Sequence, residues 1–354
     1  MLGLAGIPLG LSFGFLDPSA EAPAAAVGDL VIAALDDVSA ARQTASGATV
    51  VTYEWEGVPA ETARALELDM PVFPPPRALE VSQDRLLEKD TFGSLGIATA
   101  PYRAVDDRAT LHAAVDELGL PAVLKTRRGG YDGKGQAVLR SSVDLGVAWE
   151  RLGGVPLILE GFVPFSRELS IVAVRGRDGE IECWPAVENQ HVGGILHLTR
   201  APAPGLDNAL QARAEACIRP LLESLEYVGV GCVELFEVDG TLLANEMAPR
   251  VHNSGHWTIE GADTSQFENH LRAVLGWPLG STAPRGVSAM VNCIATMPDR
   301  DQVLAVPGAH LHEYGKETRP GRKLGHITVT ATDEATLEER LASVEVLVGS
   351  RGPS

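Results

Sequence analysis

The chain has 354 residues, of which 45% are apolar and 21% charged, and its formal net charge is -18 at pH 7. This length allows two or three domains, while the acidic balance argues against nucleic acid as a partner because a phosphate backbone favours a basic surface. No apolar run approaches the roughly 18 residues of a membrane-spanning helix, and the N-terminus lacks the features of a signal peptide. The cysteines are far apart and form no CxxC pair, which predicts buried thiols in a reducing cytoplasm. They are Cys183, Cys217, Cys232 and Cys293.

The opening third of the chain alternates apolar runs with small-residue segments, which is typical of βα units. Residues 11–16 and 29–34 are the clearest candidate strands. Residues 71–76 read PVFPPP, and three consecutive prolines cannot continue a helix or a central strand. We therefore expect the first domain to end at residue 76.

The middle of the chain mixes strands with amphipathic helices. Asp107 or Asp106 is expected to cap a helix. Residues 121–124, 157–163 and 169–174 have the apolar character of strands. A further helix presents one apolar face, formed by Leu210, Cys217, Ile218, Leu221, Leu222 and Leu225.

A second proline- and glycine-rich stretch, residues 277–286, indicates another boundary. It is followed by candidate strands at residues 287–295 and 326–331, a closing helix near residues 335–348 and a frayed tail at 349–354. The sequence therefore predicts an α/β protein with three domains. Their expected bounds are residues 1–76, 77–280 and 281–354.

A glycine-rich basic loop follows the first of these central strands. Residues 124–136 read LKTRRGGYDGKGQ, so the strand ends near Lys125 and continues into four glycines. Glycines let a backbone approach a polyphosphate and present N–H groups to it, while a lysine neutralises its oxygens. The spacing does not match the GxxxxGK[ST] pattern, and alone the loop fits a solvated hairpin equally well. The lysine at the strand end favours phosphate binding.

Two acids flank a predicted hairpin. Asp239-Gly240 is a strong signal for a two-residue turn between apolar strands. Pairing across it places Glu234 opposite Asn245 or Glu246, depending on whether the turn carries a bulge. Two adjacent carboxylates need a cation or a proton, and Mg²⁺ held by carboxylates and phosphates meets that need. Solvated hairpin acids are the safer interpretation of this feature alone, but the apolar neighbours favour a site.

Residues 248–257, APRVHNSGHW, come directly after these acids. Arg250 suits bidentate capture of a carboxylate or phosphate. His252 and His256 have no third ligand nearby, so structural hydrogen bonds are favoured over metal binding. The density of polar groups beside the acids marks this segment as part of the candidate site.

Residues 316–326, KETRPGRKLGH, form a basic cluster in an otherwise acidic chain. A solvated turn explains the cluster by itself. Together with the glycine-rich loop it indicates two anion sites, and hence two phosphorylated or carboxylated substrates. Glu160 and Glu168, near strand ends, are weaker candidates for binding the amino and hydroxyl groups of a nucleotide.

In this order, the segments closely resemble the ATP-grasp family of N5-carboxyaminoimidazole ribonucleotide synthases. The similar stretches are GGYDGKGQ at residues 129–136, NEMAPRVHNSGHWT at 245–258 and RPGRKLGH at 319–326. Residues 84–86 and 52–54 are also similar to the family. The resemblance extends through most of the chain, and its second motif is long enough to be specific.

The resemblance implies that ATP and Mg²⁺ serve to phosphorylate bicarbonate, and that carboxyphosphate passes its carboxyl group to 5-aminoimidazole ribonucleotide in purine biosynthesis. It also implies a homodimer. The implied fold has an N-terminal Rossmann-like pre-ATP-grasp domain, a two-lobed ATP-grasp domain and a small β-rich C-terminal domain. The family's opening turn, GGGQLGRM, ends where Met1 stands, so either the start is misassigned or the chain is shortened. If it is shortened, we expect the first sheet to lack an interior strand and the protein to be unstable or weakly active.

Site residues carry over from the family position by position. The implied ATP-binding residues are Arg85, Lys125, Gly130, Tyr131, Asp132, Gly133, Lys134, Gly135, Gln136, Glu160, Gly161, Phe162, Val163, Glu168, His191, Asn245 and Glu246. The implied magnesium ligands are Glu234 and Glu246. Five residues are implied in catalysis and would lie beside bicarbonate or the ribonucleotide: Arg250, Asn253, Tyr131, Asp132 and Lys316. The residues implied in binding the ribonucleotide are Glu54, Lys316, Arg322 and Lys323.

Two alternatives stay open. Another ATP-grasp carboxylate–amine ligase, or a formate-using transformylase, would share the phosphate chemistry, although the motifs at residues 129–136 and 319–326 favour the carboxylating enzyme. A nucleotide-binding module without catalysis is the other alternative. The chain retains four residues that argue against it: Lys125, Glu234, Glu246 and Arg250.

Overall fold

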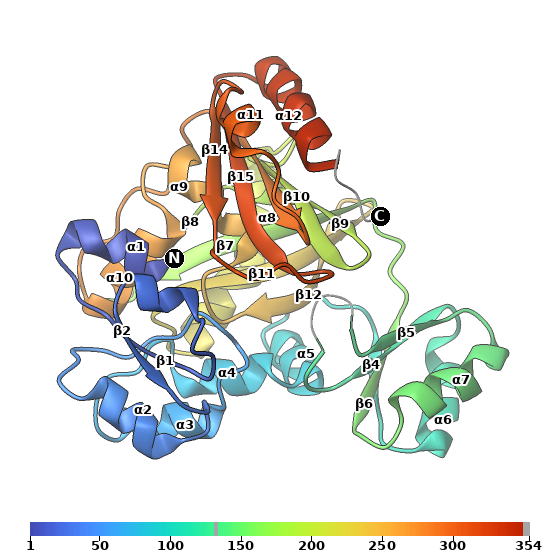
Figure 1. Cartoon of the computed structure of the whole chain (residues 1–354). Coiled ribbons are helices and arrows are strands. Elements are labelled where there is room, and N and C mark those ends of the chain that lie inside the picture. The colour runs from blue at the N-terminus through green and yellow to red at the C-terminus, as the bar shows by residue number, and fades with distance from the viewer. Residues whose placement is uncertain (131–133, 350–354) are drawn as a thin grey trace.

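The computed structural model of the protein describes residues 1–130 and 134–349. An N-terminal region and a small four-stranded lobe lie below a large central sheet in the view of Figure 1, and the C-terminal strands extend that sheet upward. Within the described residues, no helix has the length and apolar character needed to cross a membrane.

The N-terminal region, blue in Figure 1, is a small α/β unit. Its two strands pair in parallel, with Gly14 opposite Asp29, as expected for a βα unit. The proline run predicted as a boundary begins a helix at Pro76, because proline lacks an N–H that the first helical turn would leave unpaired anyway. The elements are α1 (Leu2–Gly6), η1 (Ile7–Leu9), β1 (Gly14–Asp17), η2 (Pro23–Ala26), β2 (Asp29–Ile32), α2 (Val38–Ala45), α3 (Ala60–Glu67) and α4 (Pro76–Ser82).

The small lobe is an antiparallel sheet of order β3-β6-β4-β5, with α6 and α7 packed against it. Asp107 caps α6 by accepting a 2.7 Å hydrogen bond from the backbone N–H of Thr110, which confirms one of the two predicted caps. Helix α5 leads into this lobe. The elements are α5 (Arg85–Ser94), β3 (Tyr102–Val105), α6 (Arg108–Leu118), β4 (Ala122–Thr126), β5 (Gln136–Leu139), α7 (Ser142–Leu152) and β6 (Leu157–Gly161).

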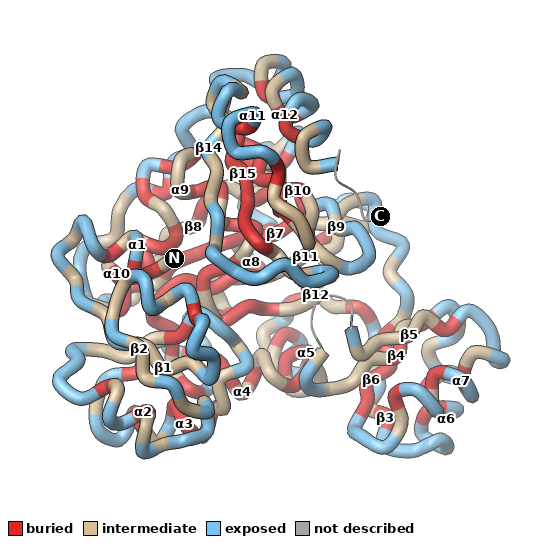
Figure 2. Tube along the Cα trace, in the orientation of Figure 1, coloured by how far each residue is buried: buried red, intermediate tan, exposed pale blue. Residues whose placement is uncertain are grey.

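The large sheet has nine strands in the order β12-β11-β7-β9-β10-β13-β15-β14, with β8 beside β7. Strand β13 of the predicted C-terminal domain pairs with β10, so the C-terminal strands continue the central sheet. Figure 2 shows β7, β11 and β15 largely buried. The elements up to the hairpin are β7 (Arg167–Arg175), β8 (Ile181–Cys183), β9 (Val187–Val192), β10 (Ile195–Ala201), α8 (Asn208–Ser224), β11 (Gly229–Val238) and β12 (Thr241–Ala248). The remaining elements are η3 (Asn253–Gly255), α9 (Thr258–Gly261), α10 (Gln266–Leu275), β13 (Val287–Ile294), α11 (Arg300–Leu304), β14 (Ala309–Glu313), β15 (Lys323–Ala331) and α12 (Glu334–Gly349).

The hairpin of β11 and β12 decides how the two acids meet. Asp239 and Gly240 have φ values of 48° and 75°, the left-handed conformations of a two-residue hairpin turn. The register places Leu235 opposite Ala244 and then Glu234 opposite Glu246, because an extra residue is accommodated between these pairs. The bulge therefore lies in strand β12, whereas the alternatives predicted from the sequence placed it in the turn.

Candidate active site

Lys125 and Glu160 form an ion pair in the candidate site. Lys125 Nζ donates a 2.9 Å hydrogen bond to Glu160 Oε2 from a diagonal position on the neighbouring strand. Burial alone would raise the pKa of Glu160, but the charges of Lys125 and Lys89 hold it below its usual value. Among the described residues, no group hydrogen-bonds the buried Oε1 of Glu160. An acceptor therefore remains for a donor such as an amino group.

Arg85 fixes the beginning of the glycine-rich loop. Its guanidinium donates to the carbonyl of Thr126 at 2.9 Å and to that of Gly130 at 3.0 Å. Asp84 accepts two further hydrogen bonds from Arg127, at 2.9 and 2.6 Å. A Cβ on Gly130 would lie 2.8 Å from a loop carbonyl oxygen, so only glycine fits there without a shift.

Glu234 and Glu246 face one another on adjacent strands, so their side chains lie on the same face of the sheet. Burial would raise the pKa of Glu234, but a hydrogen bond from His252 and the charges of His252, His191 and Lys323 lower it to about 2. Burial, and then the negative charge of Glu234, raise the pKa of Glu246. The described residues contain no cluster of three or more His, Cys, Asp or Glu that would hold a metal by itself. A cation at this pair would need further ligands from a substrate.

Arg250 and Asn253 follow directly on β12. The Arg250 side chain forms an ion pair with Glu56 of the N-terminal region, and it also donates a 2.9 Å hydrogen bond to the carbonyl of Val251. The Asn253 amide pairs with that of Asn292 in β13. Each of these two predicted residues is thus held by a side chain from another part of the chain.

The predicted ribonucleotide residues also lie together. Burial, and then the charges of Arg322 and Lys323, lower the pKa of Lys316, whereas Glu54 raises it. The three cations and Glu54 are therefore electrostatic neighbours. Glu54 additionally accepts a 2.6 Å hydrogen bond from the backbone N–H of Leu2. The charge of Lys323 also lowers the pKa of Glu234, so one cation of this cluster acts electrostatically on the acid pair.

Five further predicted residues lie at the end of β6, in the segment that follows it and in the large sheet. Gly161 ends β6, and Phe162 and Val163 begin the segment that leads to β7. Phe162 is exposed and Val163 is half-buried. Glu168 in β7 and His191 in β9 are joined by a hydrogen bond across the sheet.

The rest of the glycine-rich loop is described only in part. Lys134 and Gly135 lead into β5, which begins at Gln136. The predictions for Tyr131, Asp132 and Gly133 fall outside the described residues.

Asn245 occupies the bulge of β12, and its carbonyl accepts a 2.7 Å hydrogen bond from Lys89.

Four residues that touch these groups were not named from the sequence: Glu56, Glu88, Lys89 and Asn292. Lys89 and Glu88 are only 1% and 2% exposed, yet in the sequence they look like ordinary charges on a helix. Asn292 had a visible signal, because it interrupts an apolar strand. His252 was named as a hydrogen-bonding residue, and its Nε2 lies 3.0 Å from Glu234 Oε1.

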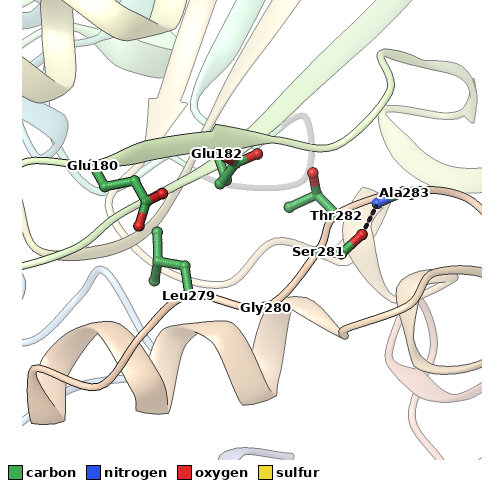
Figure 3. Close-up of a pocket in the computed structure, with 7 residues that line it drawn as sticks. All are labelled: Glu180, Glu182, Leu279, Gly280, Ser281, Thr282 and Ala283. Atoms are coloured by element: carbon green, nitrogen blue, oxygen red, sulfur yellow. Dashed lines mark hydrogen bonds between the residues drawn. The ribbon is translucent and has the colours of Figure 1, made fainter.

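A shallow depression of about 400 Å³ lies elsewhere, at β8 and the segment after α10 (Figure 3). It is lined by Glu180, Glu182 and residues 279–283. None of the predicted site residues contributes to it. In Figure 3 the carboxylate of Glu180 lies beside Leu279.

Comparison with known proteins identifies the family of the chain. Family models match a ribonucleotide synthetase preATP-grasp domain at residues 1–83, an ATP-grasp domain at 90–267 and a phosphoribosylaminoimidazole carboxylase C-terminal domain at 288–340. The predicted fold of three such domains is confirmed, while their bounds at residues 76 and 280 stay predictions.

The chain is 54% identical over 348 residues to N5-carboxyaminoimidazole ribonucleotide synthase of Pseudomonas aeruginosa, covering 98% of this chain and 96% of that protein. It superimposes on the crystal structure of N5-carboxyaminoimidazole ribonucleotide synthetase from Thermus thermophilus with a TM-score of 0.95 and 58% identity, covering 99% and 95% of the two chains. The Aspergillus clavatus synthase in complex with ADP and 5-aminoimidazole ribonucleotide matches with a TM-score of 0.93 and 31% identity, again covering 99% and 95%. The chain therefore belongs to the N5-carboxyaminoimidazole ribonucleotide synthase family of ATP-grasp enzymes.

Proposed function

We propose that this chain carboxylates 5-aminoimidazole ribonucleotide with ATP and bicarbonate, yielding N5-carboxyaminoimidazole ribonucleotide, ADP and phosphate. The observation that carries the proposal is the opposed pair Glu234 and Glu246, whose carboxylates are both influenced by cations. Lys125 acts electrostatically on Glu246, and Lys323 acts on Glu234. Two anionic substrates can therefore meet at one acid pair.

The nucleotide would occupy the region where the small lobe faces the large sheet. Lys125 would neutralise phosphate oxygens, and the unsatisfied Oε1 of Glu160 suits the exocyclic amino group of adenine. Glu168, which is held by a hydrogen bond with His191, would accept a hydrogen bond from a ribose hydroxyl.

The acid pair fits magnesium, because this ion prefers oxygen ligands and is commonly held by one or two carboxylates together with substrate phosphates. Glu234 and Glu246 supply two such carboxylates, and the raised pKa of Glu246 reflects repulsion that a cation would relieve. When bound, the ion would neutralise charge on the phosphates.

In the first step, an oxygen of bicarbonate bonds to the γ-phosphorus of ATP while the bond from that phosphorus to the bridging oxygen breaks. The products are carboxyphosphate and ADP. Such a transfer depends mainly on alignment and charge neutralisation. Arg250 and Asn253 would orient the bicarbonate, and Lys125 would hold the phosphates.

In the second step, the amine nitrogen of the ribonucleotide bonds to the carboxyl carbon. The bond from that carbon to the phosphate oxygen breaks, phosphate leaves, and the nitrogen loses a proton. Lys316, Arg322 and Lys323 would bind the ribonucleotide phosphate, with Glu54 beside them. Carboxyphosphate hydrolyses readily in water. Both substrates must therefore be bound, and water excluded from the site, when carboxyphosphate forms.

The proposal extends to a cytoplasmic homodimer. All four cysteines are free thiols, which suits a reducing compartment. The homodimer is proposed because the resemblance to the family implies it.

The test is ADP release with bicarbonate, measured with and without 5-aminoimidazole ribonucleotide. We expect ATP consumption that depends on bicarbonate and is stimulated by the ribonucleotide. No stimulation would remove the specific assignment, and a requirement for formate in place of bicarbonate would favour the transformylase alternative.

A further inference from the structure

Asn292 is a completely buried amide in the C-terminal strand β13, between Val291 and Cys293. Its side chain makes three hydrogen bonds. Nδ2 donates to the carbonyl of Leu196 at 2.8 Å and to Oδ1 of Asn253 at 2.7 Å. Its Oδ1 accepts from Nδ2 of Asn253 at 3.1 Å. Burying an amide costs free energy unless it is hydrogen-bonded, and these three contacts offset that cost.

The contact with Leu196 fixes which way the Asn292 amide points. A backbone carbonyl can only accept, so the NH₂ group of Asn292 must face it. The same NH₂ then faces Oδ1 of Asn253, and Oδ1 of Asn292 faces its NH₂. Flipping either amide would bring two donors or two acceptors together. The orientation of Asn253 is therefore determined by Asn292.

Asn253 keeps unused hydrogen-bonding capacity in this arrangement. An amide has two N–H donors and two acceptor lone pairs, and Asn292 uses one of each. Asn253 is partly exposed and lies three residues after Arg250. A separate contact holds the backbone beside Asn253: the N–H of His252 donates a 2.9 Å hydrogen bond to Oε1 of Gln266. Asn292 thus fixes the side chain of Asn253, while other contacts fix the backbone.

We propose that Asn292 is a positioning residue for carboxylation: it presents the remaining N–H of Asn253 to bicarbonate or carboxyphosphate. This inference rests on the proposed function, in which Asn253 lies beside bicarbonate. It gives the C-terminal strand β13 a direct part in building the reaction site. An asparagine free to rotate would have to be ordered by each substrate molecule, which weakens binding and alignment.

The test is a double-mutant cycle between Asn253 and Asn292, with steady-state kinetics for each substrate. Asn292→Ala should lower kcat/KM for bicarbonate about tenfold, the scale of one well-placed hydrogen bond, and leave the KM for ATP unchanged. Asn292→Asp keeps the shape but loses the donors, so it should show a similar loss. In the background of Asn253→Ala, substituting Asn292 should have no further effect on kcat/KM.

Ser288→Ala is the matched control. Ser288 lies in the same strand and is equally buried, and its hydroxyl makes no hydrogen bond within the described structure. Its substitution should leave the kinetics unchanged. Thermal unfolding of every variant separates loss of fold from loss of positioning.

Three results would overturn the inference. The first is a normal kcat/KM for bicarbonate in both folded Asn292 variants. The second is that Asn292→Ala lowers kcat/KM equally in the wild type and in Asn253→Ala, and the third is that kcat/KM falls equally for ATP and for bicarbonate. If Asn253→Ala is itself fully active, the inference also fails, although the overall reaction would stand. The proposed function fails separately, if the wild-type protein shows no stimulation by the ribonucleotide.

Discussion

Replacing Glu246 by glutamine is expected to stabilise the metal-free protein while removing most of its turnover. Directly opposed cross-strand side chains lie about 5 Å apart. Two charges at that distance repel by about 3 kcal/mol at an effective dielectric constant of about 20. Arg85 and Lys125 offset part of this repulsion, so we expect a net gain of about 1 kcal/mol. The sign follows from the raised pKa of Glu246, because an ionised carboxylate is then less stable in the folded protein than in the unfolded chain at neutral pH.

Turnover should change in the opposite direction. The proposed role makes Glu246 one of two protein carboxylates that hold magnesium, and a metal ion contributes several kcal/mol to stabilising transition-state charge. A loss of about 2.7 kcal/mol corresponds to a hundredfold fall in kcat. Urea unfolding with a chelator measures the stability, and ADP release over a range of magnesium concentrations measures the activity.

Asp239→Asn is the control on the same hairpin. Asp239 is exposed at the turn with a φ of 48°, a conformation that asparagine also adopts. It removes one negative charge without touching the acid pair, so turnover should stay normal. Near-normal turnover of Glu246→Gln, or a metal-free protein less stable than the wild type, would contradict the reasoning.

Two other glutamates give contrasting predictions. Glu160→Gln should destabilise the protein by about 3–5 kcal/mol in urea unfolding, because Lys89 and Lys125 would lose the carboxylate that pairs with them. The ammonium of Lys89 is only 1% exposed, so water cannot replace that partner. Unchanged stability would contradict the burial argument. Glu88→Gln should flatten the pH dependence of stability between pH 4.5 and 8, because burial raises the pKa of Glu88 from 4.5 to about 8. A raised carboxyl pKa means that the contribution of Glu88 to wild-type stability is fully present below pH 4.5 and falls by about 1.4 kcal/mol per pH unit up to pH 8. Parallel pH profiles for wild type and variant would show that Glu88 does not titrate in this range.

The local features of this fold could be predicted from sequence because short-range physics controls them. Asp239-Gly240 specifies a hairpin turn, since few other residues adopt left-handed conformations easily. Asp107 caps a helix with its own side chain. The phosphate-binding role of Lys125 and the glycines that follow it stays a prediction. Three ordered motifs added the family, and with it the set of candidate site residues.

Only the tertiary structure decided how these residues meet. Whether Glu234 lies opposite Asn245 or Glu246 depends on a bulge within β12, where Lys89 binds the backbone from 155 and 156 residues away. The orientation of Asn253 depends on Asn292, 39 residues further along. Hydrophobic pattern and turn propensity carry no information about such contacts, because the contacts form only when distant segments pack together. The sequence therefore determined which chemical groups are present, and long-range packing determined their geometry.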